Sequence, residues 1–276
     1  MNKSIIQLSF VLGFAVFACI ACKNDENNII AVEQLNYTEK YNLSDDSLQG
    51  VFTLSIQIEL PVLSSSKAAD DIRSFLVSTI FSDNYIQYDN KSILSMFADE
   101  LKQDYKATNE PMLQEIADVE HIYSFNNDYM LEGVSLLNDE NIFSYGFDQY
   151  VYMGGAHGLN VLSYYNFDTK TARRITEQDL FADGYEPAIT ELIKQYIVEN
   201  NEQINTLEDL EQSDFWVDSI KPNGNFFISD EAITYVFNPY EIAPHYIGHT
   251  EVSLPYASIA HLLKPNSPVN YLLKAE

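Results

Sequence analysis

The sequence predicts an α+β fold: a mostly antiparallel sheet with helices packed on it, arranged as two small intertwined subdomains. Three observations predict it. Apolar and polar residues alternate in a strand that begins near residue 51, two helix-period stripes follow, and short aromatic-rich runs then lead to another helix and further strands. The order β, α, α, β-meander, α, β is typical of α+β proteins. With 276 residues, 46% of them apolar, the chain can bury a sizeable core.

Hydrophobic periodicity defines the first elements. In Val51–Leu60 every second residue is apolar, which predicts a half-buried strand, and Pro61 ends it. Apolar residues at spacings of three and four predict two helices after this strand, both with their stripes in the core. The first stripe consists of Ile72, Phe75, Leu76 and Ile80, and the second of Ile93, Met96, Phe97, Leu101 and Tyr105.

Between His121 and Asp168 the pattern returns to short aromatic-rich runs. These runs are 121–126, 129–138, 142–153 and 159–167. We interpret them as an antiparallel meander, because alternating aromatic and polar residues suit a sheet with one covered face. Its last hairpin is predicted to turn at 154–158, a stretch rich in glycine.

One short helix, one longer helix and three strands are predicted after the meander. Thr176, followed three residues later by Asp179, is a capping arrangement for a short helix through 180–181. The longer helix begins near Glu186 with Pro187 in its first turn. An acidic stretch, 200–218, leads to the last elements, which are strands at 225–229, 232–238 and 250–254 and a helical turn at 256–263.

The opening segment indicates where the protein works. An uncharged apolar run, 5–21, stops at Cys22, which predicts a signal peptide over 1–21 rather than a membrane span. The segment before Cys22 resembles the lipobox of bacterial lipoproteins. The polar tetrad 23–26 after it is similar to the acidic signal that sends Bacteroidetes lipoproteins to the outer face of the outer membrane. Cys19 offers a second, poorer register, and an ordinary cleaved leader is the plainer alternative.

These features predict lipidation at Cys22, a flexible tether over 22–50, and a surface-exposed protein of the cell envelope, lipid-anchored to the outer membrane. The acyl chains would hold it there, since each buried methylene contributes about 0.8 kcal/mol. The chain has two cysteines, Cys19 and Cys22, and both lie in this opening segment. The folded part therefore has no disulfide and no cysteine nucleophile.

Charge restricts the partners. The chain has 41 acidic and 15 basic residues, for a formal net charge of −26. Phosphate binding depends on clustered Lys and Arg, so nucleic acid is not an expected partner. A strongly acidic surface instead attracts basic partners, and salt weakens that attraction. A merely solvated extracellular surface is the plainer interpretation of the same charge.

Several ordered motifs carry a family resemblance. They are Tyr152–Gly158, Tyr165–Thr169, Asp179–Phe181, Phe226–Ser229, Ile233–Phe237, Pro239–Pro244 and Val252–Tyr256. In this order they resemble the extracytoplasmic domain pair shared by the RsiV anti-sigma factor and the PdaC-type peptidoglycan deacetylases. The resemblance implies a PdaC-like subdomain at 51–150, an RsiV C-terminal-like subdomain at 151–265 and a tail at 266–276. It also implies a sensor, because this module of RsiV binds lysozyme.

The turn at 154–158 is the most enzyme-like stretch. Its glycines permit positive φ and close backbone approach, while His157 exchanges protons near neutral pH. A strained hairpin with a hydrogen-bonded histidine explains the same residues, and the sequence has no Gly-x-Ser-x-Gly elbow. Asp168 is expected to organise the turn after its strand. The ligand-binding candidates are Tyr152, Gly154, Gly155, His157, Gly158, Asp168 and Tyr240.

A second group has metal-ligand spacing. Glu241, His245 and His249 fall four apart, which would align them on one face of a helix. Pro239 and Pro244 argue against a continuous helix there. We therefore assign no metal, no cofactor and no catalytic residue.

The sequence favours a non-enzymatic, surface-tethered binding or sensing module. Its expected partner is a basic extracellular protein, with a cationic cell-wall hydrolase such as lysozyme first, or a cell-wall glycan. The rival interpretation is a cell-envelope enzyme that acts on glycan or peptide through His157 and a nearby carboxylate. That enzyme requires a concave pocket in which His157 lies beside Asp or Glu.

Overall fold

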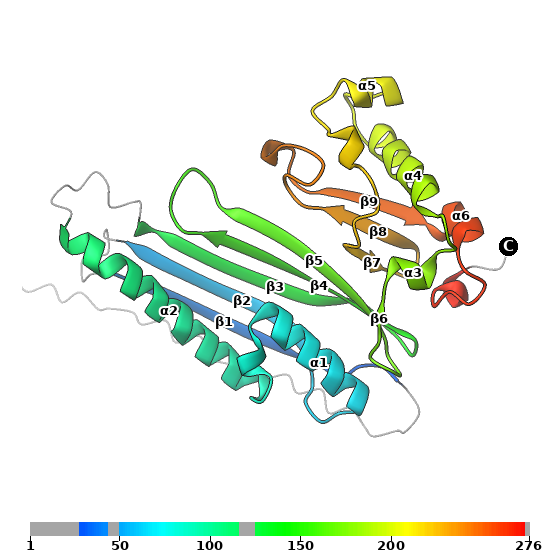
Figure 1. The fold of residues 1–276 in the computed structure, drawn as a ribbon. Helices are drawn as coiled ribbons and strands as arrows, with labels where there is room; N and C mark the ends of the chain where they lie inside the picture. The colour runs from blue at the N-terminus through cyan, green and yellow to red at the C-terminus, as the bar shows by residue number, and fades with distance from the viewer. Residues whose placement is uncertain (1–27, 44–49, 116–124, 274–276) are drawn as a thin grey trace, which may run out of the picture.

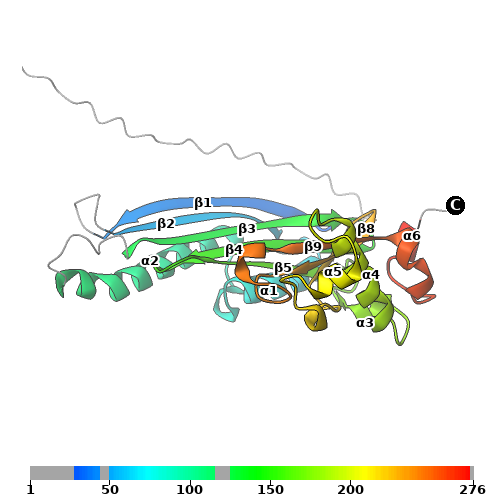
Figure 2. The same cartoon turned by 90° about the horizontal axis from the view of Figure 1, so that it is seen from above.

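The computed structural model describes residues 28–43, 50–115 and 125–273 and contains two sheets (Figure 1). The predicted signal peptide, Cys22 and the tetrad 23–26 lie outside these ranges. Within them, no helix combines the length and apolar character that crossing a bilayer requires. The larger sheet extends along most of the molecule, and the smaller one lies toward one end of it, as Figure 2 also shows.

Six strands form the larger sheet, in the order β1-β2-β3-β4-β5-β6. They are β1 (Val32–Asn42), β2 (Val51–Pro61), β3 (Asn127–Asn138), β4 (Ile142–Tyr152), β5 (Leu159–Asp168) and β6 (Arg174–Ile175). Neighbours pair antiparallel except β2 and β3, which are parallel because a long helical connection returns the chain between them. The predicted strand after residue 50 and the meander of β3, β4 and β5 are confirmed.

Helices α1 (Lys67–Ile80) and α2 (Asn90–Glu115) cover one face of this sheet. Ser66 caps α1 by accepting a hydrogen bond from the Ala69 amide at 3.1 Å. Both predicted apolar stripes are buried or partly buried, with one correction: Met96 is 38% exposed. Met96 lies beside the line of buried residues that Ile93 and Phe97 form along α2, so its side chain reaches solvent.

A buried arginine joins the two helices. Arg73 of α1 is fully buried, and its guanidinium donates to the side-chain oxygen of Asn90 at 2.7 Å, to the Ile86 carbonyl at 3.0 Å and to the Tyr88 carbonyl. Asn90 in turn donates to the Pro61 carbonyl at the end of β2, at 3.2 Å. The charge is thus stabilised inside the fold by neutral oxygens.

Strand β1 corrects the prediction of a flexible tether over 22–50. Residues 32–42 pair with β2 throughout, from Val32 opposite Pro61 to Asn42 opposite Val51. β1 is an edge strand, and Leu35 is its one buried side chain. Its other side chains are exposed or half-buried. The apolar residues that pack on the core, Leu35, Tyr37 and Tyr41, are interrupted by Glu39, so the sequence lacks the unbroken alternation that identified β2.

The second unit combines a three-stranded antiparallel sheet, in the order β7-β8-β9, with short helices. Its strands are β7 (Phe226–Ile228), β8 (Ala232–Phe237) and β9 (Thr250–Pro255), and its helices are α3 (Glu177–Leu180), α4 (Glu186–Glu199), α5 (Leu207–Glu211) and α6 (Tyr256–Ile259). The capping box of Thr176 and Asp179 is present, and Pro187 lies in the first turn of α4. α3, α4, the three strands and the last helical turn are as predicted, whereas α5 lies in the acidic stretch 200–218, for which no helix is predicted.

Three segments differ from the expected organisation. The larger sheet continues past residue 150, because β5 and β6 belong to it. Residues 266–273, expected as part of a tail, pack on the second unit, where Val269 is fully buried. They also reach the turn between β3 and β4, where the Tyr271 hydroxyl donates to Asp139 at 2.5 Å. The run expected as a strand at 121–126 is described only at its last two residues, and β3 begins at Asn127.

Three asparagines join the two units. Asn166 of β5 bonds to a carbonyl and an amide of β7, at 2.8 and 3.1 Å. In the other direction, Asn238 bonds to both backbone groups of Leu162 at 2.8 and 3.0 Å, and Asn225 accepts from the Tyr164 amide at 3.0 Å. A side-chain amide can do this because it carries a donor and an acceptor, as a peptide group does. The contacts fix β5 against the second unit and bring two loops together.

Candidate functional site

The hairpin between β4 and β5 holds most of the candidate residues. Gly154 and Gly155 have φ values of 82° and 103°, a conformation that glycine adopts at little cost. The Tyr152 hydroxyl donates to the Gly155 carbonyl at 3.0 Å, and Nδ1 of His157 lies 3.0 Å from the Gly158 carbonyl oxygen. The chain thereby forms a tight turn on which His157 is exposed.

Tyr240 lies in the loop that follows β8. Its φ is 70°, which is strained for a residue with a side chain, and that side chain is 52% exposed. Hydrogen bonds hold the loop on both sides: Asn238 bonds to the edge of β5, and the Tyr240 amide donates to the Ala243 carbonyl at 3.0 Å. A strained backbone that its surroundings fix in this way is more common at functional sites than elsewhere.

Stacked histidine rings bring the hairpin and this loop together. The ring of His157 stacks on that of His245, with 4.1 Å between centroids and 26° between planes. The His245 ring also lies 5.6 Å from that of Tyr240. Tyr246 is 68% exposed, and a hydrogen bond to Asp214 raises the pKa of its phenol. We call the following residues the hairpin–loop surface: Tyr152, Gly154, Gly155, His157, Gly158, Tyr240, His245 and Tyr246.

The chemistry of this surface suits contact more than proton transfer. Exposed tyrosine and imidazole rings offer apolar faces with polar edges, which protein and carbohydrate partners can cover. His157 is exposed, and among the described residues no carboxylate hydrogen-bonds to it. The arrangement that an enzyme using His157 requires, a recessed histidine beside Asp or Glu, is therefore not found in this part of the chain.

Asp168 lies far from the hairpin–loop surface. It ends β5, the strand that Leu159 begins, so the length of the strand, about 30 Å, separates it from the hairpin. Its carboxylate accepts hydrogen bonds from the amides of Lys170 and Thr171 at 3.0 and 2.8 Å. Asp168 therefore organises the turn before β6, as expected, and is not part of this site.

Glu241, His245 and His249 do not line up as metal ligands. The segment that holds them is a loop with a short 3-10 turn at His245–Ile247, because Pro244 precedes that turn and Gly248 follows it with a φ of 79°. Glu241 instead accepts a hydrogen bond from Asn223 at 2.9 Å. Within the described ranges, no group of three or more His, Cys, Asp or Glu side chains could hold a metal ion.

Family models match both halves of the chain. One described as Deacetylase PdaC matches residues 52–160, and one described as a protein of unknown function, DUF3298, matches residues 178–257. A curated relative, the anti-sigma-V factor RsiV of Bacillus subtilis (strain 168), is 32% identical over 106 residues. The chain carries an RsiV/PdaC-type domain pair. The matched segment is 36% of this chain and 36% of RsiV.

Two solved structures share the fold of this domain pair. A member of the DUF3298 family from Bacteroides fragilis gives a TM-score of 0.81 at 24% identity, over 91% of this chain and 100% of that one. A DUF3298 family protein from Pseudomonas aeruginosa gives 0.56 at 15% identity, over 86% and 95%. These structures confirm the α+β fold class. The hairpin belongs to the PdaC match and the Tyr240 loop to the DUF3298 match, so the hairpin–loop surface is shared by both domains.

Two members of this surface, His245 and Tyr246, are not among the binding candidates that the sequence predicts. His245 has only metal-ligand spacing, and Tyr246 belongs to no predicted motif. Both directly follow Pro244 in the motif that contains Tyr240, so an aromatic cluster in one loop was a usable signal. The stacking of His157 on His245 joins residues of different domains, and no local pattern predicts that contact.

Proposed function

We propose that this chain is an extracytoplasmic binding or sensing module that recognises a basic partner through the hairpin–loop surface. The observation that carries the proposal is the meeting of His157 with His245 and Tyr240, which forms an exposed aromatic patch from two domains. Aromatic side chains dominate the energetics of protein interfaces, and a rigid backbone lowers the entropy lost on binding. The positive φ of Tyr240 and the hydrogen bonds around it provide that rigidity.

Charge supports a basic partner, and lysozyme is the first one to test. The net charge of −26 attracts cationic proteins, and Glu241 and Asp214 place carboxylates next to the aromatic residues. A cationic cell-wall hydrolase is also a protein that an extracytoplasmic module would meet. The resemblance to RsiV, whose extracytoplasmic module binds lysozyme, supports the same choice.

The Tyr240→Ala variant tests the surface. Calorimetric titration of lysozyme into the full chain at low ionic strength should show binding, and Tyr240→Ala should weaken it at least about tenfold, as expected for a central aromatic residue. Alanine keeps the same positive φ at similar strain, so the loop should keep its shape.

Tyr88→Ala is the matched control, because Tyr88 is 37% exposed and lies on the connection between α1 and α2. Its affinity for lysozyme should stay within about twofold of the original chain. Equal losses in both variants would argue against the hairpin–loop surface. Failure of the original chain to bind lysozyme would remove lysozyme as the partner.

We also propose that Cys22 anchors the chain to the outer membrane and displays it at the cell surface. The apolar run before Cys22 and the acidic tetrad after it support this proposal. Metabolic labelling with a palmitate analogue in a bacterial host should mark the original chain and Cys19→Ala, while Cys22→Ala should carry no label. Label in Cys22→Ala would mean that the anchor lies elsewhere.

A further inference from the structure

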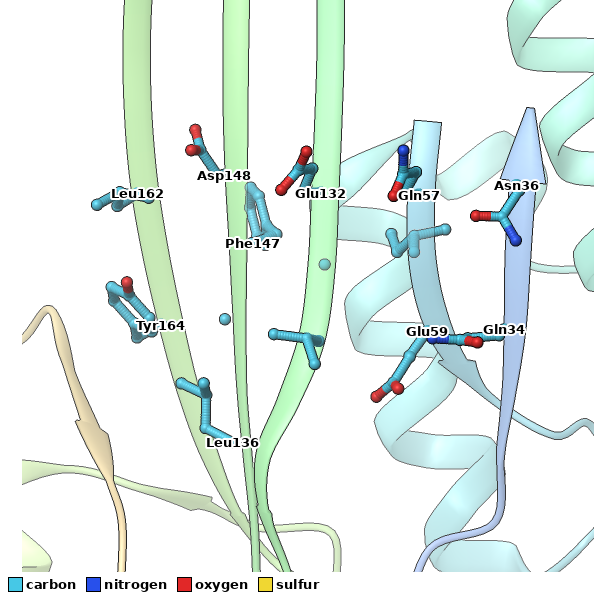
Figure 3. Close-up of a pocket in the computed structure, with 14 residues that line it drawn as sticks. Gln34, Asn36, Gln57, Glu59, Glu132, Leu136, Phe147, Asp148, Leu162 and Tyr164 are labelled. Carbon is cyan, nitrogen blue, oxygen red and sulfur yellow. The ribbon is translucent and has the colours of Figure 1, made fainter. Parts of the chain in front are cut away.

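The open face of the six-stranded sheet, opposite α1 and α2, carries a pocket separate from the hairpin–loop surface. The pocket has a volume of about 300 Å³ and is lined from five neighbouring strands, β1 to β5. Figure 3 shows its side chains in rows across these strands. One row consists of Asn36, Gln57, Glu132, Asp148 and Leu162, and the next of Gln34, Glu59, Val134, Gly146 and Tyr164.

Two carboxylates in the first row face each other without compensation. Glu132 and Asp148 are directly opposite in the pairing of β3 with β4, and their side chains lie next to each other in Figure 3. The pocket lining contains no Lys or Arg, and within the described ranges neither carboxylate forms an ion pair. Like charges directly opposite on a sheet destabilise it. Their arrangement therefore costs stability in the free protein.

Burial increases the free-energy cost of the unpaired carboxylate of Asp148. Oδ1 of Asp148 is buried and has no hydrogen-bond partner among the described residues. A buried acceptor without a hydrogen bond has lost its hydrogen bonds to water and has gained none from the protein, which costs free energy. Glu59 in the same pocket shows the contrast, because its Oε2 accepts hydrogen bonds from both the amide and the hydroxyl of Ser135, at 2.9 and 2.7 Å. Glu59 is held by the fold, whereas Asp148 lacks a donor.

Apolar side chains flank the carboxylates. Val134 and Leu136 are 46% and 39% exposed on this face, and Leu162 lies beside Asp148 in the pairing of β4 with β5. Tyr164 lies across Gly146, because a Cβ on that glycine would come within 2.5 Å of the tyrosine ring. A glycine at this position thus leaves the tyrosine ring lying along the floor of the pocket.

Burial and nearby carboxylates also shift the pKa of the Tyr164 phenol. Burial raises its pKa to about 12, and the nearby carboxylates of Glu251 and Asp148 add to the rise. The phenol is protonated at neutral pH, and its ring is an uncharged, electron-rich face near the carboxylate of Asp148. A cation placed against such a face and near two carboxylates is stabilised by both.

We propose that this pocket is a second binding site, which takes an arginine or lysine side chain of a polypeptide partner. The carboxylates of Glu132 and Asp148 would hold the charged head, and a turn of the Asp148 carboxylate would bring the buried Oδ1, which lacks a donor, into the pocket. Val134, Leu162 and the ring of Tyr164 would contact the aliphatic stem. Charge complementarity selects this occupant, since the pocket is lined by acidic, amide and apolar side chains and by no basic one.

The test uses the full chain and a fluorescent hexaarginine peptide, with a hexacitrulline peptide as its neutral isostere. At low ionic strength the Glu132→Gln/Asp148→Asn double variant should bind hexaarginine at least about tenfold more weakly than the original chain. The matched control is Glu202→Gln/Asp218→Asn, which makes the same chemical change at two exposed positions away from the pocket. Its affinity should fall by less than about twofold.

Three outcomes would overturn the proposal. Equal losses in the two double variants would mean that diffuse acidity attracts the peptide. Equal binding of hexacitrulline would remove the requirement for a cation. Spermine that competes as well as hexaarginine would make the ligand a small polyamine.

A thermal midpoint for the pocket variant no lower than that of the original chain shows that a loss of binding is not a loss of fold. The Tyr240→Ala variant should bind hexaarginine as the original chain does, so this result is independent of the lysozyme test.

Discussion

Successive side chains of each strand point to opposite faces of the six-stranded sheet, and the two faces serve different purposes. On the face that α1 and α2 cover, apolar side chains fill the core, and even the buried charge of Arg73 is met by three oxygen acceptors. On the open face, Glu132 and Asp148 stand opposite each other with no cation in the pocket around them. The covered face supplies stability, and this stability permits uncompensated charge on the open face.

Arg73→Ala should have the largest effect and would break the covered face. The change leaves three acceptors without their donor and opens a cavity between the helices. We expect a loss of about 4 kcal/mol in the free energy of unfolding, measured by urea denaturation. Arg173→Ala is the control, because that side chain is 61% exposed and pairs with Asp179 at 2.5 Å, and its loss should stay under about 1 kcal/mol. Similar losses would contradict a structural role for Arg73.

Tyr129 packs against Phe97 of α2. Its ionisation makes the stability of the covered face depend on pH. Burial raises the pKa of its phenol to about 12, although a hydrogen bond from Gln149 opposes the rise. The folded pKa lies above the unfolded value of about 10, so this contribution is complete below about pH 10 and is lost as pH rises through about 12.

That contribution is about 2.7 kcal/mol in full, from a difference of about two units between the two pKa values at about 1.4 kcal/mol each, and most of it is lost by about pH 12. The Tyr129→Phe variant should therefore lose less free energy of unfolding between about pH 9 and about pH 12 than the original chain, by roughly this amount. Tyr88→Phe, at an exposed position, should lose as much as the original chain. An unchanged loss in Tyr129→Phe would show that its ionisation is not coupled to folding.

Glu132→Gln should have the smallest effect and the opposite sign. Removing one of two facing charges on the open face should raise the free energy of unfolding by under about 1 kcal/mol at low salt. The gain should shrink as salt screens the repulsion. Glu202→Gln, an exposed change elsewhere, should leave stability unchanged within about 0.5 kcal/mol. A destabilised Glu132→Gln variant would mean that the open face contributes to the fold.

Much of the fold could be predicted from local patterns. The alternation in β2, the stripes of α1 and α2 and the capping box of Thr176 and Asp179 each depend on residues close in sequence. The sequence does not identify β1, because an edge strand buries little and Glu39 interrupts the alternation of Leu35, Tyr37 and Tyr41. The packing of Val269 was missed for a similar reason, since a single buried residue in a polar segment has no periodicity.

The candidate site was predictable in its parts and not in its assembly. Glycines and an aromatic motif identified the hairpin and Tyr240 separately. Their contact depends on Asn238 bonding to β5 and on the ring of His157 reaching His245, both across long stretches of sequence. The facing pair of Glu132 and Asp148 likewise depends on the register of β3 with β4, which includes a bulge near Ser135. Spacing along the chain does not specify such a register.

The salt dependence of lysozyme binding tests the central claim, that this chain is a binding module for a basic partner, most directly. Calorimetric titration of lysozyme into the full chain should show binding at about 10 mM salt and clearly weaker binding at about 500 mM, because attraction between opposite net charges is screened. Binding that is lost in Tyr240→Ala at the lower salt would assign it to the hairpin–loop surface. No affinity for lysozyme at about 10 mM salt, where electrostatic attraction is strongest, would contradict the claim for this partner.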